Sequence, residues 1–144
     1  MDPSAFEDIL AQAPVSIILA DREGTIRLWN RASEALFGFA ASEVIGKSLD
    51  VIIPEHLRKS HWEGYDRSLA SGATKYSGRV MTTRAVHKDG RRLYVDFSFG
   101  MLKDAAGNVL GAMAAGRDAT ERYLAEREMR AKLAAAAKPA PGGA

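Results

Sequence analysis

The sequence predicts an α+β fold, in which a five-stranded antiparallel sheet carries helices on one face. Two observations support this prediction. Segments with period-two alternation are joined by short turn-forming sequences, which is typical of antiparallel hairpins. Apolar residues at helical spacing occur between these hairpins and at both ends of the chain. Strands that are grouped, and do not alternate one by one with helices, favour α+β over α/β.

The composition narrows the class of protein. The chain has 144 residues, enough for one domain with its own core, and 47% of them are hydrophobic. Its formal net charge is only +2, and the sequence shows no single-sign face of the kind that nucleic acid requires. No apolar run could cross a membrane and no signal peptide is recognisable, so we expect a cytoplasmic protein. The absence of cysteine excludes disulfides, thiolate nucleophiles and iron–sulfur clusters.

An amphipathic helix and a β-hairpin are predicted for the first 30 residues. The helix spans residues 1–13 and ends at Pro14. The hairpin pairs residues 16–20 with residues 25–30 through the turn-forming stretch Asp21–Gly24. The apolar side chains that share one face of the helix are Phe6, Ile9 and Leu10. Because so short a helix is not stable alone, it must dock on the domain or on a partner.

A longer helix is predicted from Pro54 to Ser71, after two short helices over residues 31–37 and 41–46. At about 100° per residue, one of its sides carries Leu57, His61, Gly64, Tyr65 and Ser68. His61 therefore points inward, with a glycine one turn further on. This arrangement suits either a ligand to a flat group or a core histidine that is hydrogen-bonded to a carbonyl. The spacing alone favours the core histidine, and we expect His56 and His87 at the surface.

The second half of the chain is predicted to supply three more strands and a last helix. The strands cover residues 76–86, 91–101 and 109–115, and the first two are joined by an Asp-Gly turn. The apolar residues that alternate along the second strand are Leu93, Val95, Phe97 and Phe99. The predicted divisions of the chain are an N-terminal helix over residues 1–13, a core over 14–119, a C-terminal helix over 120–137 and a disordered tail over 138–144.

Catalytic signatures are missing from the sequence. It contains no paired inward carboxylates, no nucleophile with a matching base and no glycine-rich phosphate loop. The aspartates that stand out are placed for turns and helix caps instead, namely Asp21, Asp89, Asp104 and Asp118. We therefore expect a protein that is not an enzyme.

Five short motifs follow one another along the chain. They are Asp21–Ile26 (Asp-x-x-Gly-x-Ile), Asn30–Gly38 (Asn-x-Ala-x-x-x-Leu-Phe-Gly), Glu43–Gly46, Lys88–Arg91 and Arg117–Arg122. Together they resemble a PAS sensory domain over about residues 5–122. Each motif is weak alone, but their order is specific. The resemblance implies a PAS-like sheet, a role in signal transduction, and a C-terminal helix that carries the signal.

The longer helix is similar to that of the haem-binding PAS domains of rhizobial oxygen-sensing histidine kinases. Those domains share Pro-Glu-x-x-Arg-x-x-His ahead of a Gly-Tyr pair; Pro54–His61 matches this pattern, and Gly64-Tyr65 is displaced by one residue. The resemblance implies that haem b is held by His61 as the proximal iron ligand. It places Arg67 and Lys75 near the propionates. The other residues that it implies around the haem are Leu57, Gly64, Tyr65, Met81, Val95, Phe97 and Phe99, the last three forming the apolar distal wall.

One position departs from that pattern. The arginine that donates to bound oxygen in those sensors aligns with Met81, and strand alternation puts Arg79, but not Arg84, on the same face. Without that donor, bound oxygen would lose a charge-assisted hydrogen bond. Met81 is then either an ordinary packed methionine, which we favour, or a soft sixth ligand to iron. The expected signal is a diatomic gas or the redox state of iron.

Other PAS chemistries are partly excluded by the lack of cysteine. Photosensory flavin adducts and covalently attached coumarate both need a cysteine, whereas non-covalent flavin binding stays open. The alternative to haem is a cofactor-free module for dimerisation or protein interaction, or a site for another small apolar ligand. We expect a homodimer through the terminal helices, because their apolar faces include Phe6 and Ile9 at one end and Leu124, Met129 and Leu133 at the other. An output domain is not evident, so a signalling partner protein or a longer chain must carry the response.

Overall fold

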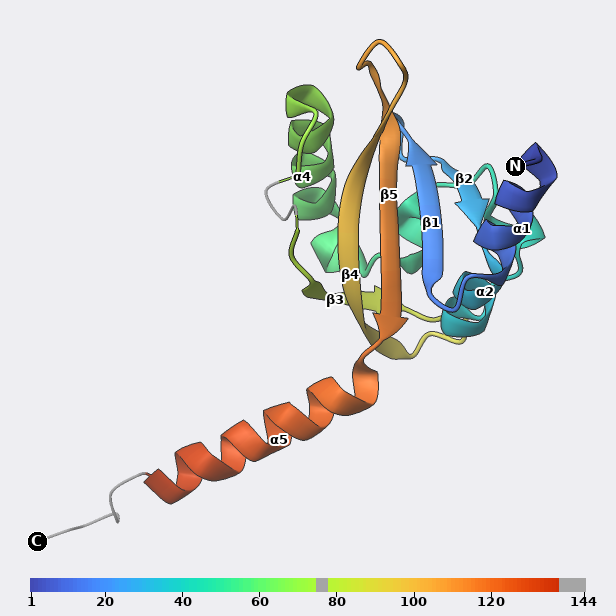
Figure 1. The fold of residues 1–144 in the computed structure, drawn as a ribbon. Helices are drawn as coiled ribbons and strands as arrows, with labels where there is room; N and C mark the ends of the chain where they lie inside the picture. Colours follow the sequence, from blue (N-terminus) through green and yellow to red (C-terminus); the bar gives the residue numbers. More distant parts are fainter. Residues whose placement is uncertain (75–77, 138–144) are drawn as a thin grey trace, which may run out of the picture.

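A computed structural model of the chain describes residues 1–74 and 78–137. Its elements form a curved sheet with helices around it (Figure 1). The helices are α1 (Pro3–Gln12), α2 (Arg31–Phe37), α3 (Ala41–Val44), the 3₁₀ turns η1 (Leu49–Ile52) and η2 (Glu55–Leu57), α4 (Arg58–Ser71) and α5 (Thr120–Ala137). The strands are β1 (Ser16–Asp21), β2 (Ile26–Trp29), β3 (Met81–Val86), β4 (Arg92–Lys103) and β5 (Val109–Asp118).

The sheet has the strand order β2-β1-β5-β4-β3, and every neighbouring pair is antiparallel. The last strand in the chain therefore lies at the centre of the sheet, between the first strand and the fourth. This confirms the predicted α+β class with five antiparallel strands. We call the sheet face covered by α2, α3 and α4 the inner face, and the opposite face the outer face.

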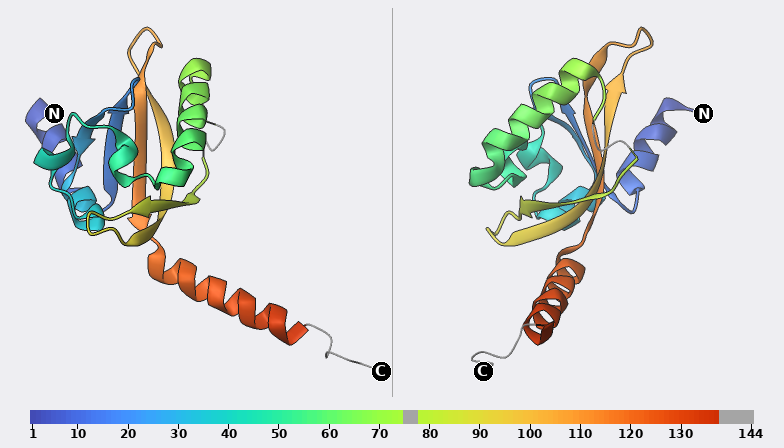
Figure 2. Two further views of the ribbon diagram at one scale, coloured as in Figure 1. Left: turned by 180° about the vertical axis from the view of Figure 1, so that it is seen from behind. Right: turned by 90° about the vertical axis from the view of Figure 1, so that its left-hand side faces the viewer.

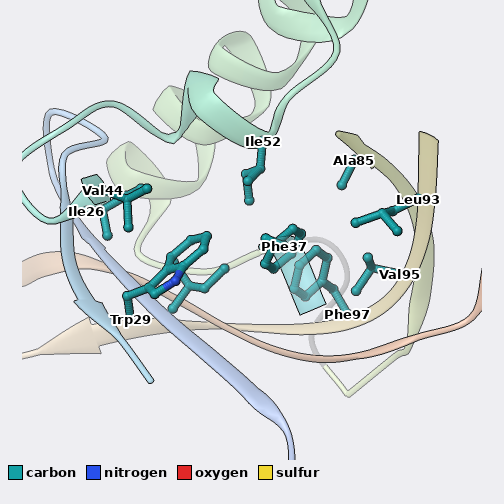
Figure 3. Packing of buried hydrophobic residues seen from close by; sticks show 10 residues of the cluster. Ile26, Trp29, Phe37, Val44, Ile52, Ala85, Leu93, Val95 and Phe97 are labelled. Carbon is teal, nitrogen blue, oxygen red and sulfur yellow. The ribbon is translucent and has the colours of Figure 1, made fainter. Parts of the chain in front are cut away.

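The hydrophobic core lies on the inner face. Phe37 of α2 is fully buried, and its ring lies 5.3 Å from that of Trp29 and 6.4 Å from that of Phe97, measured between centroids. Figure 3 shows these rings together at the centre of the cluster. Val95 and Leu93 are buried beside them, as their alternation along the strand predicts. The helices are thus fixed to the sheet by β-strand and helix residues that interdigitate.

Asn30 ties the N-terminal segments together. Its Oδ1 accepts hydrogen bonds from the backbone N–H groups of Ile17 and Ser33, at 2.9 and 3.1 Å. Its Nδ2 donates to the carbonyl oxygens of Leu10 and Val15, at 3.0 and 2.9 Å. The sequence predicts only the helix cap. The side chain also connects α1, β1 and α2, and a buried amide satisfied in this way orders all three segments.

Several predicted boundaries and positions change. The strand expected from residue 76 begins at Met81, and residues 75–77 and the predicted tail over 138–144 lie outside the described residues. The prediction that His87 lies at the surface is wrong. Its side chain is only 14% exposed because the imidazole packs over Gly38, where a Cβ would lie 2.4 Å from the ring. His56, in contrast, is exposed as predicted.

The two terminal helices lie outside the core. Figure 2 shows α1 on the opposite side of the sheet from α4, and Figure 1 shows α5 running away from the domain. Neither helix contains a buried residue. Phe6 and Ile9 of α1 are more than half exposed, whereas Leu10 is half-buried, so the apolar face of this helix is only partly covered within the described chain.

Candidate cofactor site

The candidate site is built on α4, which follows the 3₁₀ turn η2 and ends where Gly72 adopts a left-handed backbone conformation. The predicted division of this helix into an inward side and an outward side is confirmed. The residues on the inward side are buried or half-buried: Leu57, His61, Trp62, Gly64, Tyr65, Ser68 and Leu69. The residues on the outward side are exposed: Lys59, Glu63, Asp66 and Arg67. The histidine therefore faces the domain interior.

His61 carries a buried ring nitrogen without a partner. Its Nδ1 has no hydrogen-bond partner among the described residues, so this nitrogen does not form the carbonyl bond of an ordinary core histidine. Burial lowers the pKa of His61, and the weaker influence of the Asp50 charge only partly opposes this shift. The imidazole is thus neutral at pH 7, which is the form that binds metals.

Trp62 and Tyr65 surround the imidazole. The ring centroids of His61 and Trp62 are 4.6 Å apart in an edge-to-face arrangement, and the Tyr65 ring lies 5.9 Å from His61. Trp62 Nε1 donates to Asp50 Oδ1 at 2.8 Å, which orients the indole. The indole also covers Gly24 in the β1–β2 turn, where a Cβ would come within 2.2 Å of the ring. The sequence predicts neither contact, because both join segments far apart along the chain.

Gly24→Ala is expected to lower the free energy of unfolding by about 2–4 kcal/mol, because a β-carbon is strained at φ +78° and also meets the Trp62 ring. Gly46→Ala is the matched control. Gly46 has a similar φ of +87°, but no atom lies within 4 Å of the position that its Cβ would take, so we expect a loss of only about 1 kcal/mol. Urea denaturation of both variants measures the difference. Equal losses would contradict the contact between Trp62 and Gly24.

Tyr65 is held by the backbone of the first hairpin. Its hydroxyl donates to the carbonyl oxygen of Asp21 and lies 3.4 Å from that of Ala20. Burial, together with the nearby Asp21 charge, raises the pKa of Tyr65 from 10.0 to about 12. Because α4 is attached here to the end of β1, the tyrosine fixes the distance between the helix and the sheet.

The raised pKa of Tyr65 predicts a loss of stability in alkali. The folded chain keeps a phenolic proton that the unfolded chain releases, so the stabilisation is complete below pH 10 and is lost as the pH rises from 10 towards about 12. Tyr65→Phe removes this pH dependence. Denaturation curves at pH 9 and pH 11 are expected to differ more for the wild type than for the variant. Tyr123→Phe serves as the control and should keep the pH dependence of the wild type. If Tyr123→Phe also removes the loss of stability between pH 9 and pH 11, the assignment of this loss to Tyr65 is wrong.

The sheet side of the predicted site lies on β3 and β4. Met81 pairs with Phe97 across the two strands, so it shares the inner face with Val95 and Phe99. Arg84 pairs with Tyr94 and belongs to the other face, as strand alternation predicts. The described structure thus brings these four residues together on one wall. The described ring contacts of His61 are with Trp62 and Tyr65, not with this wall.

The remaining predicted residues are Leu57, Gly64, Arg67 and Lys75. Arg67 is exposed, and its Nη2 lies 3.8 Å from the position that a Cβ on Gly64 would take. No other described side chain approaches that position within 4 Å, so space remains beside the glycine. Leu57 is half-buried at the start of α4, and Lys75 lies outside the described residues. A neutral histidine whose buried Nδ1 has no partner among the described residues, with space one turn away, fits a haem ligand, and a proximal histidine is all that the protein must supply to the iron.

Comparison with known proteins identifies the family. The sequence profile of the PAS fold matches residues 10–124. This chain belongs to the PAS family. The solved PAS domain of a protein from Colwellia psychrerythraea superposes on this PAS domain with a TM-score of 0.71, at 19% identity, over 82% of this chain and 97% of that one. At such an identity the likeness shows the fold alone.

Two curated relatives of this PAS domain are named as sensors. The oxygen sensor protein DosP of Escherichia coli K12 is 28% identical over 128 residues, which is 89% of this chain and 16% of DosP. The sensor protein FixL of Bradyrhizobium diazoefficiens is 27% identical over 95 residues, which is 66% of this chain and 19% of FixL. The likeness to the rhizobial sensors is therefore real but distant, and this chain spans less than a fifth of either relative.

Proposed function

We propose that this PAS domain is the sensory part of a signalling protein and binds haem b through His61, so that it senses a diatomic gas or the redox state of iron. The observation that supports this most directly is the buried Nδ1 of His61, which has no partner among the described residues. Burying an unsatisfied nitrogen costs free energy, and such groups occur where a ligand completes the site. The oxygen-sensor relative DosP points to the same class of signal.

The proposal gives each residue a role. His61 holds the group on the α4 side, and Arg67 and Lys75 interact with its propionates. The half-buried Leu57, Gly64 and Tyr65 contact its face and edge. Met81, Val95, Phe97 and Phe99 form the apolar wall that excludes water, and Met81 is the residue able to approach iron as a sixth ligand. Haem iron, when bound, supplies a coordination position for a diatomic molecule and a one-electron redox couple.

Hydrogen bonds connect β4 to the start of α5, and we propose that the signal is transmitted along them. The Thr120 side chain accepts a hydrogen bond from the N–H group of Tyr94 at 3.0 Å, and the N–H group of Ala119 donates to the Tyr94 carbonyl at 2.8 Å. Arg122 donates to Asp96 on the same strand. Tyr94 and Asp96 alternate with Val95 and Phe97, which line the inner face. A change in packing at the proposed site therefore reaches the start of α5 through a single strand.

An absorption spectrum tests the proposal. The full chain is purified from cells supplied with a haem precursor, and spectra are recorded before and after dithionite and again with CO. We expect an intense band near the blue edge of the visible region that moves on reduction and on CO addition. The shape of the reduced spectrum distinguishes a five-coordinate iron from one that Met81 also binds. A colourless protein that fails to take up added hemin would overturn the haem proposal.

A second candidate function is cofactor-free dimerisation. It is favoured by the apolar side chains left exposed on the terminal helices, which are Phe6 and Ile9 on α1 and Leu124, Met129 and Leu133 on α5. A two-fold axis that pairs these faces would bury them, and a partner signalling protein would read the result. Sedimentation equilibrium of the wild type and of Leu133→Glu measures this association. A monomer at all concentrations would contradict it.

The cellular compartment is part of the proposal. Among the described residues, no helix has the length and apolar content needed to cross a bilayer. We propose that the domain works in the cytoplasm. Absorption spectra of intact cells can record a haem sensor there.

A further inference from the structure

A cavity of about 270 Å³ lies at the edge of the sheet, apart from the site proposed above. Its walls come from η2, from β3, from the β3–β4 turn and from Arg92, the first residue of β4. The charged or polar side chains that line it are Glu55, His56, Arg84 and Arg92. Gly90 in the β3–β4 turn completes one side, with no atom within 4 Å of the position of a Cβ. The cavity is therefore lined by two arginine side chains and has open space at Gly90.

Arg84 is incompletely satisfied. The side chain is partly buried, and its Nε is fully buried without a hydrogen-bond partner in the described part of the chain. Its Nη1 lies 3.3 Å from Nε2 of His56. It forms no ion pair with any described carboxylate, although Arg58, Arg91 and Arg122 all do. A buried guanidinium N–H group without an acceptor is costly, so Arg84 is not fully satisfied by the described residues.

Arg92 adds a second positive charge to the same cavity. It also lacks an ion pair with a described carboxylate, and its neighbour Arg91 is paired with Asp89 instead. The Arg92 side chain also reaches Tyr94. Hydrogen bonding with Arg92 lowers the pKa of the Tyr94 hydroxyl, with smaller contributions from the charges of Arg84 and Arg127. Arg92 thus lies beside Tyr94 as well as at the cavity.

We propose that this cavity binds a small oxyanion of the phosphate or carboxylate class between Arg84 and Arg92. Guanidinium groups present parallel N–H donors that match two oxygens of such an anion, and charge-assisted bonds of this kind are the strong ones. The volume exceeds that of a bare phosphate, so it admits a metabolite with a small organic part. Glu55 at the rim opposes the anion and limits its affinity, whereas His56 contributes a further nitrogen.

The position of the cavity connects it to the output helix. Arg84 pairs with Tyr94 in the β3–β4 register, and the Tyr94 ring stacks on Tyr123 of α5 with centroids 3.9 Å apart. An anion between the two arginines therefore binds next to the α5 junction. It would act as an input that is independent of His61, and the proposal does not rest on haem binding.

An NMR titration of the full chain tests the site. Inorganic phosphate and malonate are the two probes, and ionic strength is held constant with sodium chloride. We expect saturable shifts of the Gly90 and His56 amide signals. Arg92→Gln is expected to weaken binding at least about tenfold, the effect of losing one charge-assisted hydrogen bond. Glu55→Gln is expected to tighten it. The probe that binds more tightly identifies the class of anion.

Arg91→Gln is the matched control, since Arg91 is adjacent in sequence and exposed but does not line the cavity. It should bind both probes as the wild type does. Because Arg92 is exposed, its replacement leaves the fold intact even if Arg84→Gln does not. Shifts that fail to saturate, or the same loss of binding in Arg91→Gln as in Arg92→Gln, would overturn the proposal.

Discussion

Replacing His61 with alanine is expected to reduce the haem content of the purified protein at least about tenfold, because the site that we propose would lose its protein ligand to the iron. The buried Nδ1 that has no described partner is removed at the same time, so the fold does not lose a hydrogen bond. The haem content is measured by pyridine haemochrome absorbance per mole of protein. Thermal unfolding of the apoprotein checks that the variant is folded.

The control for this experiment is His56→Ala. His56 lies five residues earlier, is exposed, and has a described contact with Arg84 instead of the aromatic residues of α4. It should retain haem at the wild-type level. If a folded His61→Ala protein keeps its haem, the assignment of the ligand is wrong. If His56→Ala loses haem instead, the ligand lies at the start of the helix and not within it.

Phe37→Ala is expected to lower the free energy of unfolding by about 3–5 kcal/mol, the usual cost of emptying a fully packed aromatic position. Phe37 has no exposed surface and contacts rings from both the first hairpin and β4. A loss of this size is a large part of the total stability of a single domain. Urea denaturation followed by tryptophan fluorescence reports it, because Trp29 is one of the contacting rings.

Phe6→Ala provides the matched control. The same side chain is removed from α1, where it is 55% exposed, so the expected change is within about 0.5 kcal/mol. If the terminal helices pair in a homodimer, the effect of Phe6→Ala will grow with protein concentration and that of Phe37→Ala will not. An effect of Phe37→Ala below about 1 kcal/mol would contradict its central place in the core.

The sequence predicts local features well because their causes are local. The alternation of Leu93, Val95 and Phe97 correctly indicates which side of β4 is buried, and the helical spacing correctly puts His61 on the inward side of α4. The order of the strands in the sheet, in contrast, cannot be predicted from local patterns. Pairing of β1 with β5 joins residues nearly a hundred positions apart, and periodicity carries no information about it.

The errors and omissions have the same physical origin. His87 sits in a turn, for which the sequence predicts exposure to solvent, but Gly38 at the end of α2 leaves a place for its ring. The positions of Trp62 over Gly24 and of Arg84 beside His56 also depend on how distant segments meet. For the first of these, the sequence shows only that a glycine in a turn permits the close approach of another segment, not that Trp62 is that segment. No comparable signal marks the arginine cavity.

The 18 residues of α5 extend from the end of the central strand without a buried side chain. At 1.5 Å per residue the helix is about 27 Å long. A small rotation about the junction at Ala119 and Thr120 therefore produces a larger movement at the far end of the helix. A tilt of about 5° at that junction displaces the far end by about 2 Å, from the same helix length. Displacements too small to alter the core are therefore large enough at the tip of α5 to change its separation from any helix that pairs with it.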